Sequence, residues 1–132
     1  MTSLYALVDE APSAKVVCVF EMDARPTPKG RPRFGKGRTY TPAKTVAFEE
    51  HVSLVSRQAM KGRPPTTAPV RVVALFEQVK RTRSDLDNLL KALLDGMGPV
   101  FVNDSQVVEI RARVNRGAGV DRISVLVEEV AP

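Results

Sequence analysis

The sequence predicts a single α+β domain in which two main helices accompany a mixed β-sheet. Its 132 residues suit one domain, and 43% hydrophobic with 27% charged residues is typical of a globular protein. Two observations predict the class. Short β-rich apolar runs alternate with two helix-like segments, and the last third of the chain contains further strands. The expected order is β, α, β, α and then a β-meander.

The first predicted strand covers residues 15–22, KVVCVFEM, a short apolar run rich in β-branched side chains. The preceding residues 1–14 are weakly patterned, so we expect them to be loose. Cys18 lies within the strand and is interpreted as a small buried hydrophobe. It is the only cysteine, which excludes an internal disulfide and fits a reducing cytoplasm.

Neither a membrane span nor a secretion signal is expected. No apolar run approaches the roughly 18 residues needed to cross a bilayer. The opening stretch MTSLYALVDE lacks the basic and apolar regions of a signal peptide. We therefore expect a cytoplasmic protein without a membrane partner.

Residues 23–40 are rich in proline and glycine and are expected to form a loop. Within this loop, residues 30–36 match the start of a G-x-x-x-x-G-K phosphate-binding loop. The next position must supply a hydroxyl for magnesium, but it is Gly37. Pro32 also lacks one of the N–H groups that such a loop directs at a phosphate. Nucleotide hydrolysis at this loop is therefore not expected.

The first helix is predicted from Thr41 to about Met60. Thr41 is a good N-cap, and Pro42 suits the first helical position because its missing N–H costs nothing there. His51, the only histidine, lies on this helix with no second ligand or nucleophile nearby in sequence, so we interpret it as a surface or packing residue. Residues 61–69, KGRPPTTAP, are expected to connect the helix to the next strand.

A second strand, residues 70–79, is followed by the second predicted helix. The helix is expected because an apolar stripe recurs with a period of about 3.6 residues. Ser84 and Asp87 resemble a capping box at its start, and Gly96 with Gly98 is expected to end it. The stripe consists of Leu86, Leu89, Leu90, Leu93, Leu94 and Met97.

The rest of the chain is predicted to be β-structure. A short strand is expected at residues 100–102, a turn at 103–105, and strands at 106–114 and 120–130. Residues 106–114 alternate, which is typical of a half-buried strand. One face is expected to hold Val108, Ile110, Ala112 and Val114, and the other Val107, Glu109, Arg111 and Arg113.

Positive charge is concentrated in two segments. The formal net charge is +5, yet residues 25–44 contain seven basic residues and no acid, and a second basic cluster precedes the second helix. Since a solvated surface normally mixes signs, we interpret both segments as surface that binds a polyanion rather than as a soluble loop without a partner. Phe34 and Tyr40 could stack on unpaired bases. The expected contact residues are Arg31, Arg33, Lys36, Arg38, Lys80, Arg81 and Arg83.

Asp85 and Asp87 stand at the start of the second helix. Two residues turn a helix by about 200°, so both carboxylates can face one way only if Asp85 is still extended. Asp87 and Lys91 are one turn apart and share a helical face. A hard cation such as Mg²⁺ takes carboxylates together with water and phosphate oxygens. The pattern therefore favours metal-dependent phosphodiester hydrolysis, with Lys91 orienting the phosphate or stabilising its charge.

A third acid is expected from elsewhere in the fold. Asp104, in the turn after the helix, is the strongest candidate, and Glu109 on the next strand is weaker. Asp95 is nearer in sequence, but it ends the helix, where its charge opposes the dipole, and is expected to face solvent.

Two strings of the sequence resemble the RusA family of Holliday-junction resolvases. They are DLDNLLKALLDGM, which begins at Asp85, and NDSQVVEI, which begins at Asn103. The earlier string RPRFGKGRTYTP, from Arg31, is also similar to many members, particularly phage and prophage ones. The resemblance extends from about residue 16 to 128, and the pair of later motifs is specific.

The resemblance implies a RusA-like fold and a homodimeric, Mg²⁺-dependent endodeoxyribonuclease, with Mn²⁺ as a possible substitute. Such enzymes resolve four-way DNA junctions by paired nicks in recombination and repair, and a bacterial or phage origin is expected. Carried over by position, the metal-binding acids fall on Asp85, Asp87 and Asp104 and the essential lysine on Lys91. Family members often have a basic residue directly before the first aspartate, where this chain has Ser84.

We therefore predict a junction-resolving endodeoxyribonuclease that acts on four-way junctions or other branched DNA. A twofold dimer suits a four-way junction because symmetric sites could cut opposing strands. The alternative is a non-catalytic protein that binds branched or single-stranded nucleic acid, with carboxylates that only cap a helix. That alternative predicts salt-sensitive binding that does not respond to Mg²⁺.

Overall fold

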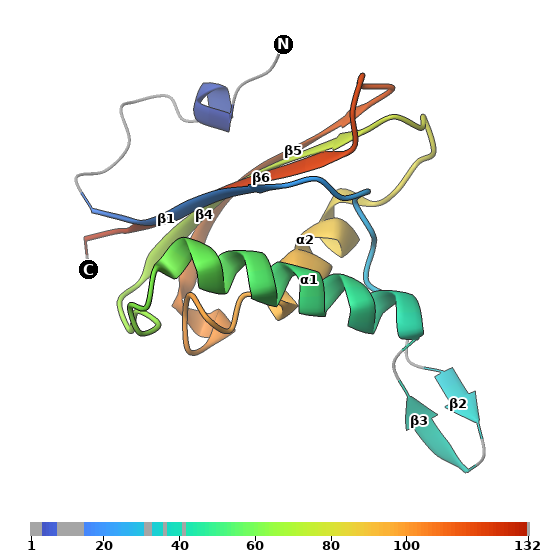
Figure 1. Ribbon diagram of the computed structural model, residues 1–132, viewed down its shortest axis with the longest axis horizontal. Coiled ribbons are helices and arrows are strands. Elements are labelled where there is room, and N and C mark those ends of the chain that lie inside the picture. Colours follow the sequence, from blue (N-terminus) through green and yellow to red (C-terminus); the bar gives the residue numbers. More distant parts are fainter. Residues whose placement is uncertain (1–3, 8–14, 31–32, 36, 41, 132) are drawn as a thin grey trace.

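The computed structural model describes residues 4–7, 15–30, 33–35, 37–40 and 42–131, and its main body is a mixed four-stranded sheet with two helices (Figure 1). The predicted α+β class is confirmed. The principal elements are β1 (Val16–Met22), α1 (Ala43–Met60), β4 (Val70–Gln78), α2 (Leu86–Asp95), β5 (Val107–Arg116) and β6 (Arg122–Glu129). The smaller ones are the 3₁₀ turns η1 (Leu4–Leu7) and η2 (Asp104–Gln106) and the hairpin strands β2 (Arg33–Gly35) and β3 (Arg38–Tyr40).

The sheet has the strand order β1-β6-β4-β5. β4 pairs in parallel with β5 and antiparallel with β6, which pairs antiparallel with β1. β5 and β6, expected as a β-meander, follow each other in the chain, but β4 lies between them in the sheet. A parallel pair needs a crossover connection, and the segment containing α2 supplies it between β4 and β5. Because the two strands are parallel, β5 starts beside the start of β4, and its end reaches the segment before α2, where Arg116 donates to the Ser84 carbonyl.

The main core fills the space between the sheet and the two helices, which cover the same face (Figure 1). Phe76 of β4, Val52 of α1, and Leu89 and Leu93 of α2 are all 0% exposed there. The side chains of β4 are buried on both faces of the sheet, which explains its nearly continuous apolar sequence.

The opposite face of the sheet carries a small apolar cluster and a buried ion pair. Leu4 of η1 packs against Val73 and Leu75, so this part of the stretch expected to be loose is a short helical turn on the sheet. Arg71 donates to the Glu128 carboxylate from Nε at 3.1 Å and from Nη2 at 2.9 Å. The Glu128 side chain is 0% exposed, and the pair joins β4 to β6.

The N-cap of each helix lies one residue later than predicted. The N-cap of α1 is Pro42, without a side-chain cap hydrogen bond, and Thr41 lies outside the described residues. The N-cap of α2 is Asp85, also without one, so the capping box expected from Ser84 and Asp87 does not form. The reason is that the Ser84 carbonyl accepts a hydrogen bond from Arg116 at 2.7 Å, which keeps this residue in the extended segment before the helix.

Three β-segments differ from the expectation. Within residues 23–40, β2 and β3 form a short hairpin, where Gly37 adopts the positive φ of 77° that favours glycine. Residues 100–102 contain only an isolated bridge from Phe101 to Thr66. The register shifts at the start of β5, so that Val107 packs on the core and Val108 is 61% exposed. One extra residue in β5 turns the side chains before it to the opposite face of the sheet, and a simple alternating pattern does not predict this change.

Cys18 and His51 lie as predicted. Cys18 is 4% exposed, and burial raises the pKa of its thiol to about 11 despite the charge of Arg63 nearby. His51 is exposed on α1. Within the described part of the chain, no helix is long and apolar enough to cross a membrane.

Candidate active site

Asp85 immediately precedes α2 and has an extended backbone, with φ of −70° and ψ of 127°. This is the conformation that Asp85 and Asp87 need if their carboxylates are to face one way. The Asp85 carbonyl already accepts the N–H of Leu89 at 3.1 Å, so the residue lies at the boundary between strand-like and helical backbone. The backbone condition derived from the sequence is therefore met.

Asp87, Lys91 and Asp104 line one hollow of about 270 Å³ between α2 and the edge strand β5. Asp87 and Lys91 come from the same face of α2, one turn apart, as predicted. Asp104 comes from η2, after the helix has ended. All three residues are exposed, so the hollow is open to a large substrate, and Asp85 is not part of its lining. Its apolar walls are Leu90, Leu94 and Ile110.

The turn that carries Asp104 is held by a capping box. The Asn103 side chain accepts the N–H of Ser105 at 2.9 Å, and Gln106 Oε1 accepts the N–H of Asn103 at 2.8 Å. The Gln106 amide also donates to the carbonyls of Thr66 and Ala68 at 2.8 and 3.0 Å. These bonds satisfy backbone groups of the turn and fasten it to the connector after α1. Asp104 is thus presented by a turn with a fixed backbone.

The other two candidate acids are engaged elsewhere. Glu109 is directed at the opposite face, where it accepts a hydrogen bond from Arg111 at 3.0 Å and lies 3.6 Å from Arg71. The bond from Arg111 lowers the pKa of the Glu109 carboxyl, and Arg71 adds to the effect. Asp95 reaches the edge of the hollow, but its carboxylate pairs with Lys29 at 2.9 Å instead of simply facing solvent.

The donor set of the hollow suits a hard metal ion. Among the described residues, no group of three or more histidine, cysteine, aspartate or glutamate side chains is placed to hold a metal. Asp87 and Asp104 still offer two carboxylates to one hollow, and oxygen is the donor that Mg²⁺ prefers. Mg²⁺ usually takes only one or two protein carboxylates and completes its shell with water and substrate phosphate. The chemistry of the residues present therefore fits Mg²⁺.

The basic leader of α2, residues 79–85, has exposed cationic side chains and an anchored backbone. Lys80, Arg81 and Arg83 are all exposed. The Gln78 amide donates to the carbonyls of Lys80 at 2.9 Å and Thr82 at 2.8 Å. With the bond from Arg116 to Ser84, these contacts fix the path of the leader up to Asp85.

The basic loop is described only in part. Arg31 and Lys36 lie outside the described residues, and for Arg33 and Arg38 only the backbone of the hairpin is described. Lys29, which the charge count placed with the polyanion-binding residues, pairs with Glu49 at 2.7 Å and with Asp95 at 2.9 Å. Hydrogen bonds to Glu49 and then Asp95 raise its pKa. Lys29 therefore joins the loop to α1 and α2.

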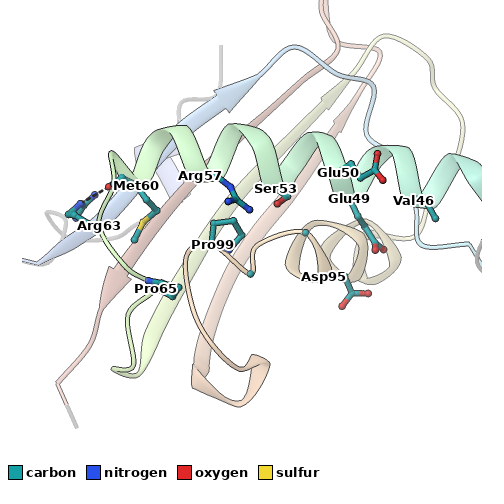
Figure 2. Close-up of a pocket in the computed structure, with 13 residues that line it drawn as sticks. Val46, Glu49, Glu50, Ser53, Arg57, Met60, Arg63, Pro65, Asp95 and Pro99 are labelled. Atoms are coloured by element: carbon teal, nitrogen blue, oxygen red, sulfur yellow. Dashed lines mark hydrogen bonds between the residues drawn. The ribbon is translucent and has the colours of Figure 1, made fainter.

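A larger hollow of about 770 Å³ lies between α1 and the segment that follows α2, as Figure 2 shows. Two of its carboxylates, Glu49 and Asp95, are partners of Lys29, and Glu50 and Arg57 also line it. Arg63, at its other end, donates to the carbonyls of Met60 at 3.0 Å and Val17 at 2.6 Å. Because Glu49, Asp95 and Arg63 already have partners, the smaller hollow, where Asp87, Lys91 and Asp104 come together, is the stronger candidate site.

Sequence reasoning missed the residues that position the site. Gln78 and Arg116 fix the leader, and Asn103 with Gln106 fixes the turn of Asp104. Only the Asn103–Gln106 pair had a local signal, because an N-cap side chain followed three residues later by glutamine resembles a capping box. Gln78 bonds carbonyls two and four residues away without a recognisable sequence pattern, whereas the acceptor of Arg116 lies 32 residues away and depends on the tertiary fold.

Two carboxylates and a lysine in an open hollow, beside an anchored basic leader, are the groups that metal-dependent hydrolysis of a polyanion would use. The family model described as "Endodeoxyribonuclease RusA" matches residues 23–128. The chain therefore belongs to the RusA family and is an endodeoxyribonuclease.

Proteins of two bacteria are similar to this chain. "Crossover junction endodeoxyribonuclease RusA" of Escherichia coli (strain K12) is 32% identical over 81 residues, which cover 60% of this chain and 67% of the relative. The protein of the same name from Shigella sonnei (strain Ss046) is 32% identical over 81 residues, with the same coverage.

Proposed function

We propose that this endonuclease resolves four-way DNA junctions by Mg²⁺-dependent phosphodiester hydrolysis, with paired nicks in opposing strands. The observation that carries the proposal is the hollow in which Asp87, Lys91 and Asp104 meet beside an exposed basic leader. The name of the relatives, crossover junction endodeoxyribonuclease, supports a junction or another branched DNA as the substrate. The protein would act in recombination and repair in a bacterial or phage-infected cytoplasm.

In this proposal Asp85, Asp87 and Asp104 hold the metal, with Mn²⁺ as a substitute. When bound, the ion would supply Lewis acidity and lower the pKa of a bound water. Asp104 would be oriented by its capped turn, and the extended backbone would let Asp85 turn towards Asp87. Lys91, on the face of α2 that carries Asp87, would hold a positive charge against the phosphate.

The basic residues would bind the DNA backbone, those of the leader next to the site and those of the loop farther along. Arg83 is the best candidate for the scissile phosphate. It is exposed two residues before Asp85, whereas the Arg81 guanidinium packs on Gly117, where a Cβ atom would lie 2.8 Å from Cζ. Arg83 would thus take the role of the basic residue that many relatives have directly before the first aspartate.

A homodimer would place two such sites about a twofold axis, which suits a junction with two opposing strands to cut. Light scattering coupled to gel filtration checks this state. A mass of about twice 14.4 kDa is expected for the protein alone and for its metal-free junction complex after the DNA is subtracted. A monomer in both samples would contradict the paired-nick mechanism.

The catalytic assignment is tested with a synthetic four-way junction, linear duplex as substrate control, and Mg²⁺ or EDTA. We expect wild-type protein to cut the junction only with Mg²⁺. Asp85→Asn and Asp104→Asn should each lower the cutting rate roughly a hundredfold or more, because loss of a ligand costs at least as much as loss of its supporting partners.

Asp23→Asn is the matched control because the Asp23 side chain is 90% exposed and lies outside the hollow. It should cut within about twofold of wild type. Wild-type protein that binds the junction but never cuts it, or an Asp104→Asn variant that cuts normally, would contradict the assignment. The first outcome would favour a protein that only binds branched DNA.

A further inference from the structure

We propose that a second groove, next to the candidate active site, binds an unpaired nucleotide of the DNA strand that is cut. The groove measures about 700 Å³, and its lining comes from residues 25–30, 42–45 and 82–84. It lies between the loop after β1, the first turn of α1 and the leader of α2, and we call it the proline groove. The proposal rests on the proposed function, since the strand is taken to be the substrate of the nuclease.

The charge of the proline groove favours an anion. Arg25 and Lys44 both line it, and none of the described residues that line it is an aspartate or a glutamate. Neither cation forms an ion pair with another residue that the structure describes, whereas Lys29 in the same loop is held by two carboxylates. Two cations without acidic partners can therefore neutralise phosphate without first breaking an internal pair.

The size and surface of the groove indicate a whole nucleotide rather than a single phosphate. Pockets that enclose small molecules measure roughly 300–1,000 Å³, and this groove falls within that range. Pro28 and Pro42 supply apolar ring surface on which a sugar or base can pack. The hydroxyls of Thr82 and Ser84 have no hydrogen-bond partner within the described part of the chain and can both donate and accept. A paired base would not reach these surfaces, but an unpaired one would.

The position of the groove connects it to the reaction. Its lining ends at Ser84, and the next residue is Asp85 at the start of α2. The groove wall formed by the leader is held in place, because the carbonyls of Thr82 and Ser84 accept hydrogen bonds from Gln78 and Arg116. A nucleotide in the proline groove would thus guide the adjoining phosphate of the same strand towards the aspartates.

The test measures binding of a short fluorescein-labelled oligothymidylate by fluorescence anisotropy in EDTA, so that no cutting is needed. The variant Arg25→Ala/Lys44→Ala removes both cations, and Thr82→Trp fills the groove without changing the charge. We expect each variant to weaken binding about tenfold or more. The double variant loses hydrogen bonds to a charged group, each worth roughly that factor, and in Thr82→Trp the new side chain occupies the space of the nucleotide. The double variant should also reduce the slope of log K against log salt by about 1.4, since each single-strand phosphate contact contributes about 0.7.

Arg57→Ala is the matched control, because Arg57 is an exposed cation of α1 outside the proline groove. It should bind within about twofold of wild type with an unchanged salt slope, and thermal melting establishes that all variants are folded. Wild-type binding by Thr82→Trp, or equal loss in Arg57→Ala, would overturn the proposal. Binding of thymidine monophosphate is measured in the same way. Variants that no longer bind this nucleotide but still bind the oligothymidylate as wild type does would also overturn the proposal. Because the binding assay contains no Mg²⁺, its result does not depend on cutting. A failure of the proposed function in the cutting assay can therefore be told apart from a failure of this inference.

Discussion

Asp85 shows how the backbone of one residue determines what its neighbours can do. With φ of −70° and ψ of 127° it ends the extended leader, and helical backbone begins only at Leu86. Had α2 begun at Ser84, as the capping pattern predicted, Asp85 and Asp87 would point about 200° apart. The hydrogen bond from Arg116 to the Ser84 carbonyl keeps the leader extended and so preserves the backbone arrangement that the proposed shared metal would require.

Gly96, the C-cap of α2, lies in close contact with α1. A Cβ atom there would lie 2.7 Å from Val52 Cβ and 2.9 Å from the Glu49 carbonyl oxygen. Because one of these neighbours is backbone and cannot rotate away, Gly96→Ala should force α2 from α1. We expect the free energy of unfolding to fall by roughly 1–3 kcal/mol in urea denaturation.

Gly98→Ala is the matched control, because a Cβ atom at Gly98 meets no atom within 4 Å. Its unfolding free energy should change by no more than about 0.5 kcal/mol. Equal destabilisation of both variants would mean that the loss of glycine itself, and not the close helix contact, causes the effect.

At the scale of elements, Lys29 joins three segments around the site. Its Nζ contacts Glu49 on α1 and Asp95 at the end of α2, while its N–H donates to the Asn88 carbonyl at 3.0 Å. Lys29→Met should lower the unfolding free energy by about 1–2 kcal/mol, since two charged contacts of a mostly enclosed ammonium are lost. Lys15→Met, which removes a 75% exposed ammonium paired with Glu129, should change it by no more than about 0.5 kcal/mol.

The Lys29 prediction also has a pH signature. Its carboxylate partners raise the Lys29 pKa above the ordinary value of 10.5, so the contribution is complete below that pH and is lost as the pH rises further. The difference in thermal melting temperature between wild type and Lys29→Met should therefore narrow above about pH 10.5. A difference that stays constant through this range would show that Lys29 acts by packing alone.

The whole molecule is expected to lose stability in acid. Arg111 chiefly lowers the pKa of Glu109, and Thr66 followed by Lys15 lowers that of Glu129, both from an ordinary value of 4.5. Carboxyls with lowered folded-state pKa values stabilise the fold above the ordinary value, and this contribution is lost as the pH falls below it. The melting temperature should therefore drop below about pH 4.5.

The double variant Glu109→Gln/Glu129→Gln should flatten this acid limb in thermal melts recorded from pH 6 to 3. Glu50→Gln, which removes one exposed carboxylate of α1, is the comparison and should retain the wild-type profile. An acid limb that is unchanged in the double variant would assign the loss of stability to other carboxyls.

Much of this fold follows from local patterns. The apolar runs of β1 and β4, the stripe of α2 and the Asp87–Lys91 spacing each concern residues a few positions apart, and all were found where predicted. Local pattern failed where a distant contact overrides it. Examples are Ser84, which is held by Arg116, and Val108, which the shift in pairing with β4 turns outward.

The sequence alone determined the residue types of the candidate site. The carboxylates, the lysine and the basic leader, with the spacings between them, are read directly from the order of the amino acids. Only the tertiary structure decided which acids meet. The crossover through α2 brings Asp104 to the hollow of Asp87, while Asp95 is drawn to Lys29 and Glu109 to Arg111 and Arg71. Apart from the bond between Glu109 and Arg111, which are two residues apart, these choices depend on pairings between residues far apart in sequence, which no local period encodes.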